Sequence, residues 1–177
     1  MTYRCSSTSP TRRCDVLLHS LQLFLAAQPL DGFYCTSANG VPLSAAATRE
    51  SWEGISQRIH WAGSSFLMPG YRAATAAHAA APAGQRCVAA VVTDGEAHDA
   101  AALCRDAAER LPDDFYLALC LLGEGPNFER AAALFQQLSA SQPRVTVVRL
   151  PAGMGAPAVA LALEGVFSGS AWFAKEL

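Results

Sequence analysis

Charge is scarce in this 177-residue chain, and no stretch of it is strongly basic. Charged residues make up 16% of the sequence, the formal net charge is −2, and the single basic pair is Arg12-Arg13. Nucleic-acid binding depends on neutralising phosphates with lysine and arginine, so this composition argues against a nucleic-acid partner. The length and the hydrophobic fraction of 51% instead predict a globular protein folded as a single domain over residues 1–177.

The sequence also lacks an apolar run long enough to span a bilayer. The segment VLLHSLQLFLAA after Arg12-Arg13 has the order of a secretory signal, but His19, Ser20 and Gln22 interrupt it. The six cysteines include no C-x-x-C pair and the four histidines have no ligand spacing, which excludes a zinc ribbon and a disulfide scaffold. We therefore expect a cytoplasmic protein with reduced thiols and no membrane contact.

Motifs that mark common enzymes on α/β folds are missing as well. Neither G-x-G-x-x-G nor G-x-x-x-x-G-K-[ST] is present, although Gly123-Glu-Gly125 follows an apolar run, and G-x-S-x-G is absent. A nucleotide or small-molecule binder, or a hydrolase, therefore stays an alternative without a motif to support it.

The second half of the chain alternates between two hydrophobic patterns. Apolar runs at 86–93, 115–122 and 144–150 predict buried strands, and helices are expected at 100–111, at 128–140 with Asn127 as cap, and from 155 to about 167. Strands that alternate with helices over short connections are typical of a parallel sheet with right-handed crossovers.

The first half predicts further elements around this sheet. Helices are expected at 15–28, at 50–60 with a break near Gly54, and at 71–81; a strand at 33–36 is expected to return at 41–43 through Asn39-Gly40. Pro42 places the return strand at an edge. The predicted fold is α/β: a doubly wound, mostly parallel central sheet with one antiparallel edge strand and helices on both faces.

One acid stands at a chemically interesting point of this pattern. Asp94 follows the apolar run VAAVV in VTDGE, at the carboxyl end of its strand, where parallel sheets bind ligands. An aspartate there can also simply close a turn or cap the next helix. The neighbouring sequence decides between these readings.

Strand, T-D-G-E and helix, preceded by an alanine-rich helix and a helix–hairpin unit, resemble the von Willebrand factor type A (vWA) family. That family assembles a metal-ion-dependent adhesion site from a D-x-S-x-S loop, a threonine in a G-G-T-like loop and the aspartate of T-D-G. In this chain Ser7 and Ser9 of CSSTS match the serines, Ser65 of GSS matches the threonine, and Asp94 matches the aspartate. The resemblance covers nearly the whole chain in order and spacing.

The resemblance implies a non-enzymatic protein-interaction module. Its binding face would be the loops at the carboxyl end of the sheet, where Mg²⁺ or Mn²⁺ held by Ser7, Ser9, Ser65 and Asp94 would bridge to an acidic side chain of a protein partner. Hard divalent cations prefer such oxygen ligands.

Two departures from the family pattern leave the metal open. Cys5 stands where the family has its first aspartate, and a thiol is a poor ligand for Mg²⁺. Glu96 is not expected to replace the lost acid. Residues 1–4 leave room only for a very short first strand, so that strand is minimal, truncated, or missing from the middle of the sheet. The site is therefore either metal-binding or a degenerate, metal-free form.

Aromatic residues beside the predicted site suggest where a partner would bind. Trp61 and Phe66, with Glu96, are candidate partner-binding residues because aromatic side chains dominate interface energetics. The alternative is that this aromatic cluster, which includes Trp52 and Tyr71, forms a small core over the sheet.

Two catalytic interpretations compete with the interaction module. Cys5 could be a nucleophile in a phosphate-binding loop, but a cysteine phosphatase needs arginine six positions later, where Thr11 stands. His98 and Asp99 could form a general base with its orienting acid, although adjacent side chains diverge and Asp99 is better suited to serving a helix N-terminus.

Overall fold

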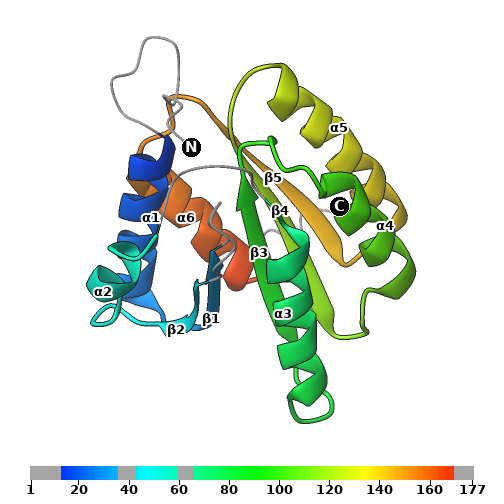
Figure 1. Cartoon of the computed structure of the whole chain (residues 1–177), viewed down its shortest axis with the longest axis horizontal. Helices are drawn as coiled ribbons and strands as arrows, with labels where there is room; N and C mark the ends of the chain where they lie inside the picture. The colour runs from blue at the N-terminus through cyan, green and yellow to red at the C-terminus, as the bar shows by residue number, and fades with distance from the viewer. Residues whose placement is uncertain (1–12, 36–42, 60–65, 170–177) are drawn as a thin grey trace.

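The computed structural model describes residues 13–35, 43–59 and 66–169 (Figure 1). The helices are α1 Arg13–Ala27, α2 Trp52–Ser56, α3 Met68–Ala80, α4 Ala100–Arg110, α5 Pro126–Ser141 and α6 Ala156–Phe167. The strands are β1 Leu30–Cys35, β2 Leu43–Ala47, β3 Cys87–Thr93, β4 Phe115–Gly123 and β5 Val145–Pro151. The predicted elements are all present, with shifts at their ends. The chain is thus an α/β protein.

The predicted parallel sheet is confirmed for the second half of the chain. Its order is β3-β4-β5, and both pairings are parallel and without a bulge. Cys87 lies opposite Phe115, and Leu117 lies opposite Val145. Because each strand is followed by a helix that returns the chain to the start of the next strand, all three carboxyl ends meet at one edge.

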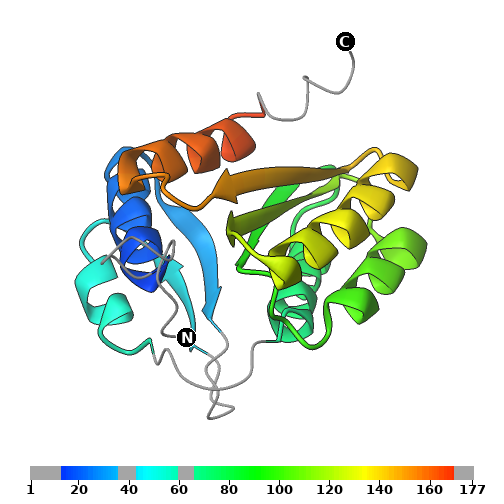
Figure 2. The same cartoon turned by 90° about the horizontal axis from the view of Figure 1, so that it is seen from above.

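The central strand β4 separates two hydrophobic cores. Leu117, Leu119 and Leu121 pack on one side with α3, α4 and α5, and Ala118, Cys120 and Leu122 pack on the other with α1 and α6. Figure 2 shows these two groups of helices on opposite sides of the sheet. Alternate side chains of a strand point to opposite faces, so an apolar residue at every position of β4 is required.

The antiparallel part of the prediction needs correction. Strands β1 and β2 do pair antiparallel, with Cys35 opposite Leu43, but among the described residues they form a separate two-stranded sheet. They do not extend the edge of the parallel sheet. The turn Asn39-Gly40 lies outside the described residues, and the return strand runs over Leu43–Ala47 instead of 41–43.

β3 also differs from the sequence expectation. We expected a buried strand, but six of its seven residues are only half-buried and Thr93 alone is buried. The reason is topological: within the described part of the chain, β3 has a neighbouring strand on one side only.

Three predicted helix ends were wrong. Helix α2 continues through Gly54, whereas a break was expected there. The cap of α5 is Gly125, not Asn127. Helix α3 begins at Met68, three residues before the expected start at Tyr71, because Asp99 accepts hydrogen bonds from the backbone N–H groups of Leu67 and Met68.

The described helices include none that is both long enough and apolar enough to cross a membrane.

Candidate functional site

Asp94 lies where the sequence placed it, directly after β3 at the carboxyl edge of the sheet. Its Oδ1 accepts a hydrogen bond from the Glu96 N–H at 3.2 Å, and the Gly95 N–H donates to Thr93 Oγ1 at 3.2 Å. Gly95 has φ +89°, and a Cβ there would lie 2.8 Å from the Asn127 carbonyl oxygen. The turn therefore requires this glycine, and it directs the acid back over the sheet edge.

Arg13, the first residue of α1, lies against this acid. Its Nη1 is 3.7 Å from Asp94 Oδ2, and its Nη2 donates to the Glu124 carbonyl oxygen at 3.3 Å. The Arg13 side chain is 12% exposed and that of Asp94 is 2% exposed. The two residues form a largely buried ion pair between the ends of β3 and β4.

Gly123 makes room for this arrangement. A Cβ built on Gly123 would lie 2.7 Å from both Cζ and Nε of Arg13, and its φ of +132° disfavours any other residue. The guanidinium therefore lies directly on the backbone at the end of β4. The Gly123-Glu-Gly125 segment, considered above for a phosphate, instead receives this arginine side chain.

Burial sets the electrostatics of Asp94. Its pKa is raised, first by desolvation and then by the nearby Glu96 charge, against the lowering effects of the Glu96 N–H and of Arg13. Among the described residues, none donates a hydrogen bond to the buried Oδ2. This oxygen can accept a proton, a hydrogen-bond donor or a cation.

Most of the predicted metal ligands cannot be placed. Cys5, Ser7, Ser9 and Ser65 all lie outside the described residues. Within residues 13–35, 43–59 and 66–169, no three or more His, Cys, Asp or Glu side chains converge on a position that could hold a metal ion. The described part of the site thus offers one carboxylate, already opposed by a guanidinium.

The predicted partner-binding residues have separate environments. Phe66 is 45% exposed, with its ring 5.8 Å from that of His98. Glu96 Oε1 accepts a hydrogen bond from Asn127 Nδ2 at 3.1 Å, and Trp61 lies outside the described residues. Trp52 and Tyr71 are buried in the cores, so the aromatic residues of this region divide between core and surface.

The His98–Asp99 pair does not form a catalytic dyad. Asp99 Oδ1 accepts from the Leu67 N–H at 2.7 Å and Oδ2 from the Met68 N–H at 2.9 Å. Both oxygens are engaged with the backbone at the start of α3. The expectation that Asp99 serves a helix N-terminus is confirmed, but the helix is α3 and not its own α4.

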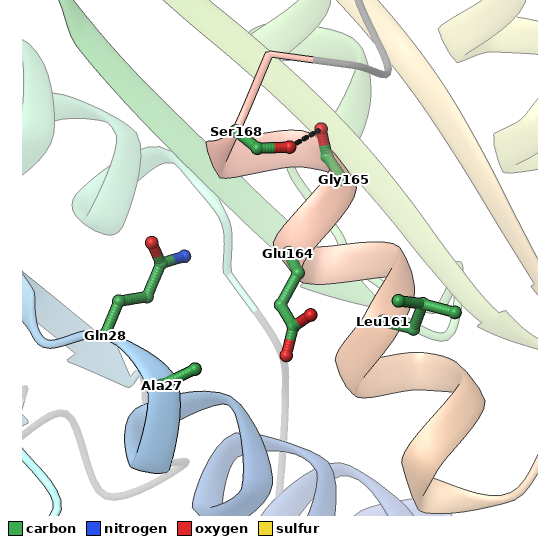
Figure 3. Close-up of a pocket in the computed structure, with 6 residues that line it drawn as sticks. All are labelled: Ala27, Gln28, Leu161, Glu164, Gly165 and Ser168. Atoms are coloured by element: carbon green, nitrogen blue, oxygen red, sulfur yellow. Dashed lines mark hydrogen bonds between the residues drawn. The ribbon is translucent and has the colours of Figure 1, made fainter.

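A groove of about 470 Å³ lies elsewhere, between the last turn of α1 and the second half of α6 (Figure 3). Its lining residues are Ala27, Gln28, Leu161, Glu164, Gly165 and Ser168. Arg13 and Ala27 are at opposite ends of α1, and a 15-residue helix is about 22 Å long, so the groove is separate from Asp94. It has a single carboxylate and no convergent polar groups, so we assign the candidate site to the sheet edge.

The fold and the site define a class, an α/β protein with a buried arginine–aspartate pair at the carboxyl edge of a parallel sheet. Comparison with known proteins takes the identification no further: no family model matches the chain, and no curated protein matches it. Arg13 is the residue that sequence reasoning missed. Its neighbour-pair Arg12-Arg13 was noticed only as a basic cluster, and no local pattern links it to an acid 81 positions further along the sequence.

Proposed function

We propose that this chain is a non-enzymatic protein-interaction module with a vWA-like architecture. It binds its partner with the carboxyl edge of the parallel sheet. The observation that carries the proposal is the buried Arg13–Asp94 pair at this edge. Ligands of parallel α/β sheets bind outside the carboxyl ends of the strands, and a buried charge pair is costly unless the site uses it.

The pair favours the metal-free form of the site. Arg13 places a guanidinium nitrogen 3.7 Å from Asp94 Oδ2, where a bound cation would otherwise supply positive charge. Asp94 is the one carboxylate in the predicted ligand set, because Cys5 replaces the other and the remaining members are serines. Mg²⁺ or Mn²⁺ would have to compete with the guanidinium, so we propose that an acidic side chain of the partner approaches Arg13 directly.

The surface beside the pair supports a protein partner. Phe66 is an exposed aromatic side chain, and Glu96 and Asn127 form a hydrogen-bonded polar pair that joins the β3 and β4 loops. An exposed aromatic anchor with a polar rim is typical of protein interfaces. Trp61 is the further aromatic residue expected on this face.

The proposal is tested with the full chain and a peptide library in which each peptide carries one aspartate or glutamate in a neutral sequence. Binding is measured in EDTA and again with Mg²⁺ or Mn²⁺. We expect acidic peptides to bind in EDTA, and Arg13→Gln to weaken them at least about tenfold because a partly desolvated charge pair is lost.

Arg144→Gln is the matched control. Arg144 also pairs with an aspartate, Asp113 at 2.7 Å, but it precedes β5 and so lies at the opposite edge of the sheet. Peptide binding that is unaffected by Arg13→Gln would contradict the proposed face. Binding that requires Mg²⁺ or Mn²⁺ and is lost in Asp94→Asn would show that the metal-bridged form is correct instead.

A further inference from the structure

The parallel sheet ends at β3, and the described residues provide no strand beyond it. Strand β4 is buried along almost its whole length, whereas β3 is half-buried. An edge strand presents unpaired N–H and C=O groups that can pair with another extended chain. The free edge of β3 is therefore a candidate docking site.

The hydrogen-bond pattern identifies the backbone groups at this edge. The Cys87 N–H donates to the Asp114 carbonyl oxygen at 2.8 Å, so Cys87 faces β4. Successive residues of a strand direct their backbone groups to opposite sides. Ala89, Val91 and Thr93 therefore also face β4, while Val88, Ala90 and Val92 present their N–H and C=O groups to the free edge.

The side chains of β3 are those of an inner strand. Its sequence CVAAVVT contains no charge and no proline, and its pairing with β4 has no bulge. Natural sheets usually protect an exposed edge with one of these features. Val88, Ala90 and Val92 pack toward one core, and Cys87, Ala89 and Val91 toward the other, so a neighbouring strand would meet apolar surroundings on both faces.

The edge lies in a recess between other elements. Helix α3 contacts both β3 and β1, and α6 contacts β3 from the other face. At Gly70 of α3, a Cβ would lie 3.0 Å from the Tyr34 ring of β1. Figures 1 and 2 both show β1 beside β3 although the two strands do not pair. The charge of Asp31 in β1 adds to burial in raising the pKa of the Cys87 thiol, which agrees with this closeness.

This recess selects the occupant. A second copy of the protein would bring the helices that cover its own sheet, and these would collide with α3 and with β1. A single extended segment carries no such layers. An uncharged, apolar segment would satisfy the β3 backbone groups without placing a charge between the two cores.

We propose that the free edge of β3 binds an extended, apolar peptide strand of a partner protein, which adds to the sheet beside Val88, Ala90 and Val92. This mode of recognition is β-strand addition, in which backbone hydrogen bonds give affinity and alternate side chains give specificity. The proposal does not depend on the function proposed for the Arg13–Asp94 edge.

The test uses the full chain and a capped synthetic peptide with an apolar core of valine and alanine, as long as the seven residues of β3, with a lysine at each end for solubility. We expect the peptide to raise the melting temperature with increasing concentration. Two further peptides carry N-methyl groups on alternate residues, one in each phase. At least one of them should bind about tenfold more weakly, because methylation removes hydrogen bonds to β3.

Ala90→Pro removes an N–H from the free edge while leaving the groups that face β4, and edge strands tolerate such a proline. It should abolish peptide binding with an unchanged circular dichroism spectrum. The methylated peptides test the same point on the unmodified protein if this variant does not fold. Asp94→Asn should bind the peptide normally, which separates this site from the sheet-edge function. No binding, equal binding of all three peptides, or dimers of the chain alone in light scattering would overturn the proposal.

Discussion

Replacing Asp99 with alanine tests whether a single long-range cap sets the start of α3. The residue before this helix is Leu67, whose side chain offers no acceptor. The acceptor comes from Asp99, at the N-terminus of α4, whose two oxygens lie 2.7 Å and 2.9 Å from the N–H groups of Leu67 and Met68. The variant removes both hydrogen bonds together with the negative charge at the helix N-terminus.

The expected loss follows from these contacts. Replacing an ordinary N-cap by alanine costs about 1 kcal/mol, and hydrogen bonds to a charged group are worth about 1.5 to 3 kcal/mol each. Because the two N–H groups are only partly buried, water recovers part of this energy. We expect Asp99→Ala to lower the free energy of unfolding by about 2 kcal/mol, which is about 4 to 8 °C in melting temperature for a chain of this size.

Urea unfolding followed by circular dichroism measures this loss, and Asp113→Ala provides the control. The Asp113 side chain is 98% exposed and pairs with Arg144 at the surface, so its removal should cost less than about 1 kcal/mol. Amide exchange in the first turn of α3 should also accelerate in Asp99→Ala alone. Equal losses in the two variants would refute the reasoning, since the geometry of the cap would then carry no energy.

Two further variants test the sheet-edge site. Gly123→Ala should cost about 2 kcal/mol through its positive φ and its contact with Arg13, and clearly less in an Arg13→Ala background; equal costs in a urea double-mutant cycle would contradict the contact. Burial raises the pKa of Asp94 above its ordinary value of 3.8, so its contribution to stability is complete below that value and is lost as the pH rises through the raised pKa. The stability of the wild type relative to Asp94→Asn should therefore fall between about pH 4 and pH 7, and urea midpoints whose difference grows over this range would show the opposite sign.

The fold was predictable wherever the signal was local. The alternation of apolar strands with helices after residue 86 identified β3, β4 and β5 and their parallel pairing, because periodicity and short connections leave few arrangements. The half-buried state of β3 was not predictable, since its sequence is that of an inner strand. Whether a neighbour lies beside it depends on elements from other parts of the chain.

The candidate site divides in the same way. Asp94 could be placed at the sheet edge from sequence, because the carboxyl end of a parallel strand is a fixed position in the topology. Arg13 could not, since its pairing with Asp94 requires α1 to begin at the end of β4 and Gly123 to leave space for the guanidinium. The partner of Asp99 was likewise visible only in three dimensions.

The sequence by itself therefore determined the α/β class, the parallel order of the strands and the position of Asp94, because these follow from hydrophobic period, turn residues and chain direction. Only the tertiary structure decided that Arg13 faces this acid, that Asp99 caps α3 and that β3 has a free edge. Each of these depends on contacts between residues far apart along the chain. Such contacts leave no local pattern, because they are set by how the helices and the two sheets pack together.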